Sequence, residues 1–265
     1  MFFKTFFLFL AVVFYTLSGV AGGNTQIDSF YKSKYHLEKY VYATNRYTFY
    51  CGAEFDESKK ITLPDGFYSK RYPDRSLRLE WEHIVPAENF GRHFAEWYQG
   101  HPDCRDKNNE TYRGRKCAEK TNRSYKLMQA DMYNLVPSVG SVNAGRQNYP
   151  YRQFKRRLPP IYGSCPMIVR DRRVQPPEHT RGMIARAYQY FESAYPVFKM
   201  SAHEKKMMGE WDSAYPVTLS ECVRCKRIEE IQGNENTIVK EKCIERRLWR
   251  TYSIFNHTLK PKGEK

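Results

Sequence analysis

Acidic residues are scarce relative to basic ones in this chain of 265 residues, which has 29 Asp and Glu against 44 Lys and Arg. The formal net charge of +15 favours polyanionic partners through long-range attraction and counterion release. Charge alone leaves three explanations open, namely nucleic-acid binding, binding to anionic lipid, and solubility. It carries no information about the fold.

Long hydrophobic runs are absent after the first residues of the chain. Residues 6–17 are almost entirely apolar, follow Lys4, and precede the small residues Gly19-Val-Ala21, a pattern typical of a cleaved signal peptide. We therefore interpret residues 1–21 as a signal peptide and expect an exported protein, periplasmic or secreted. The alternative, an uncleaved membrane anchor, is disfavoured because the run is shorter than the roughly 20 residues of a membrane span.

Repeats, low-complexity tracts and long Gly/Ser linkers are also absent, so we predict a single domain over residues 22–265. Residues 77–85 alternate as a strand does, and Pro86 follows them. Residues 100–123 are polar and rich in Asn, which predicts a long exposed loop. Residues 126–135 look helical, whereas residues 35–50 fit either a helix or a strand.

The last third of the chain is predicted to be helical. Pro176-Pro-Glu178 marks a helix start, and Ser201–Glu204 has the spacing of a capping box that opens a second helix. Thr218–Glu221 repeats this spacing for a third helix, which Gly233 would end. The aromatic-rich helices are interpreted as a structural core.

All seven cysteines follow the expected signal peptide, and export favours disulfides. Seven is an odd number, so at least one thiol stays free or bonds to another chain. The Cys222-Val-Arg-Cys225 motif has no second Cys-x-x-Cys or His pair beside it, which disfavours a zinc or redox site.

A histidine follows a glutamate where the strand at 77–85 ends, in Glu82-His83, and asparagine segments lie downstream at 131–135 and 141–148. A base, a carboxylate and amide oxygens are what a nuclease needs to hold one hard cation and activate water. Adjacent side chains of a strand point to opposite faces, so the two residues serve one site only where the strand ends. Taken singly, each residue is better explained by a structural role: a packed or surface histidine for His83, a solvated charge for Glu82 and a turn cap for Asn143.

The motifs around these residues resemble those of the bacterial endonuclease I family of periplasmic or secreted non-specific nucleases. The resemblance covers residues 45–245 and is carried by ordered motifs: Glu80-Trp-Glu-His-Ile-Val-Pro-Ala87 with Phe90-Gly91, Ala130-Asp-Met-Tyr-Asn-Leu135, Val142-Asn-Ala-Gly-Arg146, Gly163-Ser-Cys165, Arg181-Gly-Met-Ile-Ala-Arg-Ala-Tyr188 and Gln232-Gly-Asn234. It implies an α+β fold, a mixed α/β domain built around a ββα-metal (His-Me finger) motif, stapled by disulfides.

The same resemblance assigns roles to individual residues. His83 matches the general base, and Glu82 and Asn143 match the ligands of one Mg²⁺, with Mn²⁺ or Ca²⁺ as alternatives. Arg115 matches the arginine that contacts the phosphate, although Arg113 is a second candidate because this loop is longer than usual. The family cleaves DNA, and often RNA, to products that carry 5′-phosphates.

This chain departs from the family at residue 129, where Gln129 stands in Met128-Gln-Ala-Asp131 in place of a glutamate. That glutamate is associated with the metal-bound water or with the proton given to the leaving group. An amide positions a water but donates no carboxyl proton. We therefore expect an active enzyme that is slower or has a shifted pH profile, with Gln129 at the catalytic position.

A second departure concerns the cysteines, because Cys51-Gly-Ala53 replaces the C-G-C of the family and the partner cysteine is missing too. The family pattern then suggests three bridges, with Cys225 left unpaired: Cys51–Cys165, Cys104–Cys117 and Cys222–Cys243. Six cysteines allow fifteen connectivities, so the sequence alone does not select this one.

The leading hypothesis is a secreted, monomeric, Mg²⁺-dependent and largely sequence-independent endonuclease for DNA and RNA. The alternative from another class is a secreted cationic protein that coats nucleic acid without cleaving it. The alternative explains the charge but not the Glu82-His83 pair with its downstream asparagines.

Overall fold

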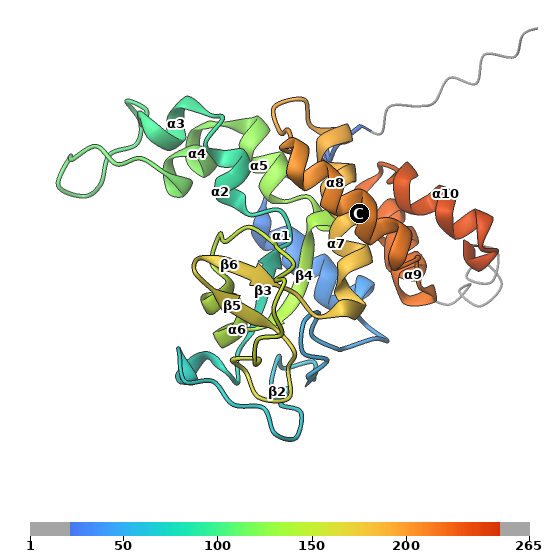
Figure 1. Cartoon of the computed structure of the whole chain (residues 1–265). Coiled ribbons are helices and arrows are strands. Elements are labelled where there is room, and N and C mark those ends of the chain that lie inside the picture. The colour runs from blue at the N-terminus through green and yellow to red at the C-terminus, as the bar shows by residue number, and fades with distance from the viewer. Residues whose placement is uncertain (1–21, 250–265) are drawn as a thin grey trace, which may run out of the picture.

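Two antiparallel strands and the helix after them form the centre of the structure. A computed structural model describes residues 22–249, so the expected signal peptide lies outside the described residues. Strand β3 (Leu79–His83) pairs with β4 (Leu135–Val139), with Trp81 opposite Pro137 and His83 opposite Leu135. Helix α6 (Gly140–Arg146) follows β4 directly and packs on both strands (Figure 1). This β3–β4–α6 unit is the expected ββα arrangement, and the strand predicted at 77–85 is confirmed in its central five residues.

The long connection between β3 and β4 carries several short helices. It contains α2 (Ala87–Gly91), α3 (Ala95–Tyr98), α4 (Arg115–Thr121) and α5 (Arg123–Gln129). The long exposed loop predicted at 100–123 is confirmed up to residue 114 and was wrong in its last third, where Arg115–Thr121 form α4. In Figure 1 the remaining loop, between α3 and α4, extends away from the body of the protein.

The helix predicted at 126–135 was also wrong in its second half. Helix α5 ends at Gln129, a 3-10 turn (Met132–Asn134) follows, and Leu135 already belongs to β4. The buried Asp131 explains the break, since its carboxylate accepts hydrogen bonds from Tyr133 N, Gln232 Nε2, and the hydroxyls of Tyr190 and Tyr195. These long-range bonds fix a conformation that local helix propensity disfavours.

The N-terminal part contains α1 (Phe30–His36), a π-helical turn (Leu37–Val41) and two very short paired strands, β1 (Glu54–Phe55) and β2 (Ile61–Thr62). The ambiguous stretch 35–50 is thus helical only at its start. A 3-10 turn (Pro73–Arg75) precedes β3. Farther along, β5 (Ile168–Arg170) and β6 (Arg173–Gln175) form a hairpin.

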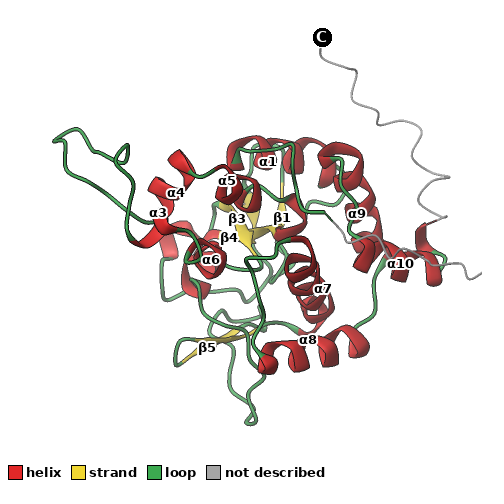
Figure 2. Ribbon diagram, turned by 90° about the horizontal axis from the view of Figure 1, so that it is seen from above, coloured by secondary structure: helices red, strands yellow, loops and turns green. Residues whose placement is uncertain are grey.

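The last third is helical, as predicted, with α7 (Glu178–Ala194), α8 (Ala202–Ala214), α9 (Leu219–Gln232) and α10 (Thr237–Glu245). Helices α7 and α8 pack on each other, and strands β3 and β4 lie between them and helices α1 and α5 (Figure 2). Ser201 and Glu204 form the complete capping box. At the start of α9 only half of the expected box is present, because Thr218 caps the helix while the Glu221 carboxylate pairs with the buried Arg186.

The described chain contains three disulfides with the connectivity suggested by the family pattern, and one of them, Cys51–Cys165, joins parts of the chain 114 residues apart. Cys225 is free and buried. Gly233 ends α9 with a φ of 79°, a left-handed conformation that glycine adopts without steric cost. Over residues 22–249 no helix has the length and apolar character needed to span a bilayer.

Candidate active site

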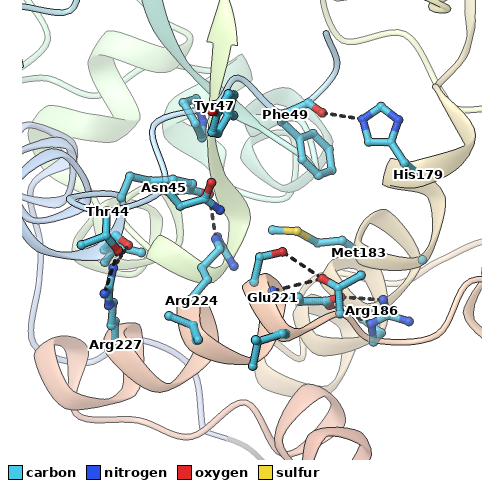
Figure 3. Close-up of a pocket in the computed structure, with 18 of the residues that line it drawn as sticks. Thr44, Asn45, Tyr47, Phe49, His179, Met183, Arg186, Glu221, Arg224 and Arg227 are labelled. Carbon is cyan, nitrogen blue, oxygen red and sulfur yellow. Dashed lines mark hydrogen bonds and ion pairs between the residues drawn. The ribbon is translucent and has the colours of Figure 1, made fainter. Parts of the chain in front are cut away.

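Two surface cavities differ sharply in the chemistry of their walls. The larger, of about 660 Å³, lies between the segment 41–49 and helices α7 and α9 (Figure 3). Its arginines are engaged in the fold, for example Arg186 with Glu221 and Asp212, and Arg224 with Tyr42 and main-chain carbonyls. The smaller cavity, of about 240 Å³, is lined by Glu82, His83 and Arg115 together. We therefore identify the smaller cavity as the candidate active site.

His83 lies at the end of β3 with 6% of its surface exposed. Its Nε2 is 2.9 Å from the main-chain oxygen of Gln129, and a carbonyl oxygen only accepts, so Nε2 carries the proton. Among the described residues nothing hydrogen-bonds Nδ1, whose lone pair is therefore available to take a proton. The rings of Phe30 and Phe90 pack near the imidazole, at centroid distances of 5.0 and 6.3 Å.

The electrostatic surroundings keep the His83 ring neutral. Burial lowers its pKa to about 3, and the positive charges of Arg115 and Arg146 act in the same direction, against the carbonyl of Gln129. A neutral imidazole at physiological pH is the form that accepts a proton. A phosphate group in the cavity would oppose the two arginines and strengthen the base.

The neighbouring Glu82 is 4% exposed and faces the opposite side of β3. Its Oε1 is 3.2 Å from Arg146 Nη1 and accepts a 3.4 Å hydrogen bond from the Tyr50 hydroxyl. Burial raises the pKa of this carboxyl to about 7, because the loss of water outweighs the attraction of Arg146 and the bond from Tyr50. With this pKa the carboxyl group is partly protonated at neutral pH, and a nearby cation would favour its ionised form.

Arg146 explains how two consecutive residues of a strand reach one cavity. Its Nη1 donates to the main-chain oxygen of His83 at 3.1 Å and its Nη2 to that of Ile84 at 2.7 Å. The same guanidinium pairs with Glu82 and lies 4.8 Å over the ring of Tyr151. It therefore binds the carbonyls at the end of β3, where the pairing with β4 stops, and fixes Glu82 and His83 around the same opening.

Arg115, the first residue of α4, is exposed and lines the cavity, whereas Arg113 donates to Tyr98 O and does not line it. Of the two candidate arginines, Arg115 is therefore the one that the structure places at the cavity. Arg115 Nε donates to the side-chain oxygen of Gln129 at 3.2 Å, and its guanidinium lies 5.5 Å from the ring of Phe30. Gln129 does not line the cavity; it holds Arg115 with its side chain and His83 with its main chain.

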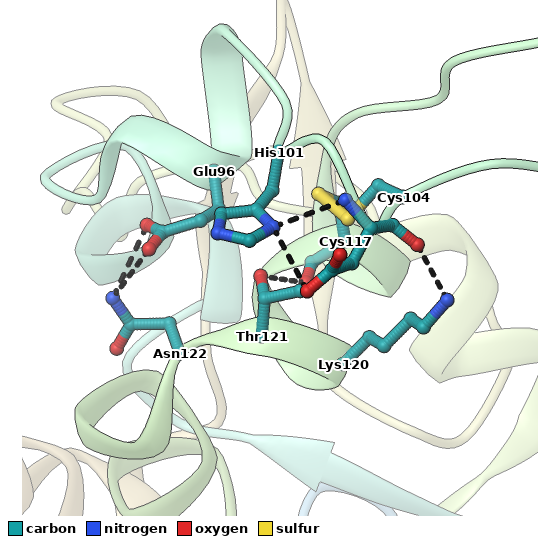
Figure 4. Close-up of a disulfide and its surroundings, with 8 residues drawn as sticks. Glu96, His101, Cys104, Cys117, Lys120, Thr121 and Asn122 are labelled. Atoms are coloured by element: carbon teal, nitrogen blue, oxygen red, sulfur yellow. Dashed lines mark hydrogen bonds and ion pairs between the residues drawn. A yellow bond between two sulfur atoms is a disulfide. The ribbon is translucent and has the colours of Figure 1, made fainter.

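The disulfide Cys104–Cys117 secures the start of α4 (Figure 4). Cys117 lies two residues after Arg115, and the bridge attaches this turn to the long loop before it. Lys120 Nζ adds a hydrogen bond to Asp103 O, and Asn122 at the end of α4 donates to the carboxylate of Glu96 on α3. Arg115 is therefore positioned from both sides, although it lies on the surface.

Asn143 is partly buried on α6 and does not line the cavity itself. Its Nδ2 donates to Glu80 Oε2 at 2.8 Å, and Glu80 is in turn bound by Arg75 Nε at 2.8 Å. This arrangement assigns the amide orientation and leaves Oδ1 without a hydrogen bond from any described residue. Gly140 makes the close approach of α6 to β3 possible, since a Cβ there would lie 2.7 Å from Glu80 Oε1.

The donor set fits a hard divalent cation. Within residues 22–249 there is no group of three His, Cys, Asp or Glu side chains able to enclose a metal, so zinc-type coordination has no support there. Mg²⁺ takes oxygen ligands and keeps several waters, and for such an ion one carboxylate and one amide oxygen suffice. Glu82 on β3 and Asn143 on α6, whose Oδ1 is free, are the residues with oxygens of this kind, and the two elements pack on each other.

Comparison with known proteins identifies the family of this chain. The family model described as Endonuclease I matches residues 25–243. The chain belongs to the endonuclease I family. It is 36% identical to an extracellular deoxyribonuclease of Aeromonas hydrophila over 82% of this chain and 90% of that protein. It is 36% identical to a periplasmic deoxyribonuclease of the same species (77% and 82%) and 35% identical to Endonuclease-1 of Buchnera aphidicola (83% and 84%). The protein is therefore a nuclease.

Sequence reasoning missed the residues that hold the site together, namely Tyr50, Glu80, Arg146 and Tyr151. The Tyr50 and Tyr151 hydroxyls are 2.5 Å apart and join Glu82 and Arg146 in one buried network. The sequence did contain a signal for Glu80. Residues two apart on a strand share a face, so Glu80 lies on the same face as Glu82. No local pattern marks the others, since their partners lie about 30 to 100 residues away in the sequence.

Proposed function

We propose that this protein is an exported, Mg²⁺-dependent endonuclease that hydrolyses DNA, and RNA as well, with little sequence preference. The observation that carries the proposal is the hydrogen bond from His83 Nε2 to Gln129 O, which leaves Nδ1 as a free base in a cavity shared with Glu82 and Arg115. Export is supported by the names of the relatives, which are extracellular and periplasmic deoxyribonucleases. The net charge of +15 suits a polyanionic substrate.

In this mechanism the substrate phosphate enters the cavity beside Arg115, whose guanidinium binds a non-bridging oxygen. His83 Nδ1 takes the proton of a water aligned opposite the 3′ oxygen, and the hydrogen bond to Gln129 O keeps the ring in the required tautomer and orientation. Glu82 and Asn143 would hold the cation, which supplies neutralisation of charge on the phosphate. Breaking the bond to the 3′ oxygen leaves the phosphate on the 5′ end.

Nonspecificity has a physical basis in this arrangement. The cavity walls offer a base, a carboxylate and a guanidinium, which recognise a phosphodiester rather than the edge of a base. Gln129, which occupies the position of a family glutamate, has its amide oxygen bound by Arg115. We therefore propose that the leaving-group proton comes from water and that Gln129 acts as a positioning residue.

A plasmid-cleavage assay tests the proposal. Oxidised protein is incubated with plasmid and Mg²⁺, with and without EDTA, beside His83→Ala and the control His179→Ala, whose exposed ring lies at the larger cavity. We expect cleavage by the wild type and the control, and loss of at least about 100-fold with EDTA or His83→Ala. Equal cleavage in every arm would contradict the mechanism, and stable binding without cleavage would support a cationic coating protein instead.

Two finer points need their own measurements. Replacing the plasmid by a structured RNA tests the second substrate, and cleavage at a rate within about 10-fold of DNA is expected because the cavity contacts only the phosphate. Ligation of the DNA fragments without prior phosphorylation tests the 5′-phosphate. Fragments that ligate only after kinase treatment would show that the other phosphate bond breaks.

A further inference from the structure

The β5–β6 hairpin and the segment before β5 carry an unusually dense positive charge. Between residues 149 and 177 there are seven basic residues and one acidic residue, Asp171. Six of the basic residues are exposed and form what we call the basic hairpin patch: Lys155, Arg156, Arg157, Arg170, Arg172 and Arg173. The hydrogen bond from Phe154 N to Gln175 Oε1 holds the first half of the patch beside the second.

The fold makes almost no use of these charges. Within the described chain, the patch has one ion pair, between Arg170 Nε and Asp171 Oδ2 at 3.7 Å. The arginines that stabilise the fold behave differently, since Arg75, Arg146 and Arg186 each meet a carboxylate. Several positive charges of the patch are thus left for a ligand.

The hairpin turn contains one residue, Arg172, that a stable turn of this type would avoid. Arg170 pairs with Arg173, so Asp171 and Arg172 form a two-residue loop, and their φ angles are 48° and 56°. Such turns favour glycine at the second position, where a bulky side chain is strained. Two arginines directly across the strands also repel each other. An anionic ligand on the hairpin would relieve this repulsion.

The patch lies next to the candidate active site. Gln147 and Asn148 line the cavity, and the next residue, Tyr149, has its ring 6.0 Å from the Arg172 guanidinium. Tyr151 then bridges to Val174 on β6. Three residues from Asn148 span at most ~11 Å. At one charge per ~1.7 Å of duplex axis, roughly six phosphates occupy that length.

We propose that the basic hairpin patch binds the backbone of duplex DNA away from the scissile phosphate and thereby holds the duplex across the cavity. This inference rests on the proposed nuclease function and extends it from the reacting phosphate to its neighbours. The chemistry favours a nucleic-acid backbone over an anionic membrane. Surfaces that bind membranes insert large apolar side chains, whereas none of the strongly exposed large hydrophobic residues of the described chain lies between 149 and 177.

The test uses a variant that removes four charges: Arg156→Ala, Arg157→Ala, Arg172→Gly and Arg173→Ala. Steady-state kinetics are measured on a duplex of 30 base pairs and on thymidine 5′-p-nitrophenyl phosphate, which is too short to reach the patch. We expect KM for the duplex to rise at least 10-fold, with kcat on the small substrate unchanged. The slope of log KM against log salt concentration should flatten by about 0.9 for each phosphate that the variant no longer binds. Equal losses on both substrates, or no change on the duplex, would overturn the proposal.

Three comparisons separate direct DNA binding from a structural role. Lys199→Ala with Lys206→Ala removes exposed charges in and just before α8, and KM should stay within twofold of the wild type. Asp171→Asn removes the one carboxylate of the segment and should lower KM. Arg172→Gly alone should raise KM for the duplex. Its Tm should be unchanged or higher, because glycine suits the turn. A lower Tm with an unchanged KM would contradict direct DNA binding by the patch.

Duplex binding followed by fluorescence anisotropy in EDTA keeps this inference separate from the proposed function. If the wild type cleaves neither substrate, the nuclease mechanism fails. The DNA-binding role of the patch is still tested, because it requires that the four-site variant bind the duplex more weakly than the wild type. Binding to vesicles with 30% phosphatidylserine tests whether the patch binds an anionic membrane instead. Loss of vesicle binding with unchanged duplex binding would overturn the assignment to DNA.

Discussion

Arg115 Nε donates a 3.2 Å hydrogen bond to the side-chain oxygen of Gln129, and the main-chain oxygen of Gln129 is 2.9 Å from His83 Nε2. One residue therefore positions both the proposed base and the proposed phosphate-binding arginine. The two interactions come from different atoms, so a substitution of the side chain affects Arg115 while the support of His83 remains. This separation makes the role of residue 129 measurable.

Gln129→Leu should lower kcat/KM for duplex DNA about 10-fold without unfolding the protein. A hydrogen bond to a charged group contributes about 1.5–3 kcal/mol, and 1.4 kcal/mol corresponds to one order of magnitude. Gln129→Glu keeps an acceptor for Arg115 and should retain or exceed wild-type activity. Steady-state kinetics and a thermal melt check both variants. Wild-type kinetics in Gln129→Leu would show that Arg115 does not depend on this bond.

The disulfide that secures α4 should matter for activity more than its location suggests. Replacing Cys104 and Cys117 by serine removes a bridge of sequence separation 13, and we expect a stability loss of about 3 kcal/mol. Well below the Tm, kcat/KM should still fall several-fold because the turn carrying Arg115 is released.

The control is the bridge Cys222–Cys243, with a sequence separation of 21. Replacing both of its cysteines by serine should cost a similar amount of stability, about 3 kcal/mol, with kcat/KM unchanged. Denaturant unfolding and kinetics at 20 °C compare the two variants. A similar drop in kcat/KM for both would mean that general destabilisation, rather than the position of Arg115, controls activity.

The Tyr50 hydroxyl should tune the affinity for the cation. Tyr50→Phe removes its 3.4 Å bond to Glu82 and its 2.5 Å bond with Tyr151, so the carboxylate is less firmly oriented. We expect the Mg²⁺ concentration for half-maximal cleavage to rise about 5-fold with kcat at saturation nearly unchanged. Tyr162→Phe is the matched control, since this buried tyrosine makes only a 3.5 Å bond, to Ser141 O. An equal rise in both variants would argue against a specific role.

His83 should make the protein less stable in mild acid. Burial, reinforced by Arg115 and Arg146, lowers the pKa of His83 from 6.5 to about 3 in the folded state. The unfolded chain therefore binds this proton first, and the contribution of His83 is complete above pH 6.5 and lost as the pH falls toward 3. The slope is about 1.36 kcal/mol per pH unit.

Urea unfolding in EDTA between pH 7.5 and 4.5 measures this effect without a bound cation. Between pH 6.5 and 4.5 the wild type should lose about 2.5 kcal/mol more than His83→Gln, which keeps a donor for Gln129 O but does not titrate. Glu82, whose pKa is raised to about 7, acts in the opposite direction in both proteins and cancels in the comparison. Parallel pH dependence in the two proteins would rule out a buried neutral His83.

Local pattern predicted the strand at 77–85, the helix caps at Ser201 and Gly233, and the helical last third. These features depend on neighbours within a few residues, so the sequence contains the whole of their physical cause. The same reasoning failed at 126–135, where Asp131 binds Tyr190, Tyr195 and Gln232 about 60 to 100 residues away. The capping box predicted at Thr218 was correct for the cap itself and wrong for its glutamate, because Glu221 pairs with Arg186 on another helix.

For the candidate site, the sequence predicted which types of residue take part, but it did not predict how their side chains lie relative to one another. Glu82 and His83 are adjacent in the sequence, yet a strand points them to opposite faces. Arg146 on α6 binds the carbonyls at the strand end and the Glu82 carboxylate, and both residues line one cavity. The position of Arg115 at the cavity likewise depends on a disulfide and on a bond to Gln129. Covalent neighbours are set by the sequence, whereas burial, ion pairs and the pKa values of Glu82 and His83 arise only when segments distant in the chain pack together.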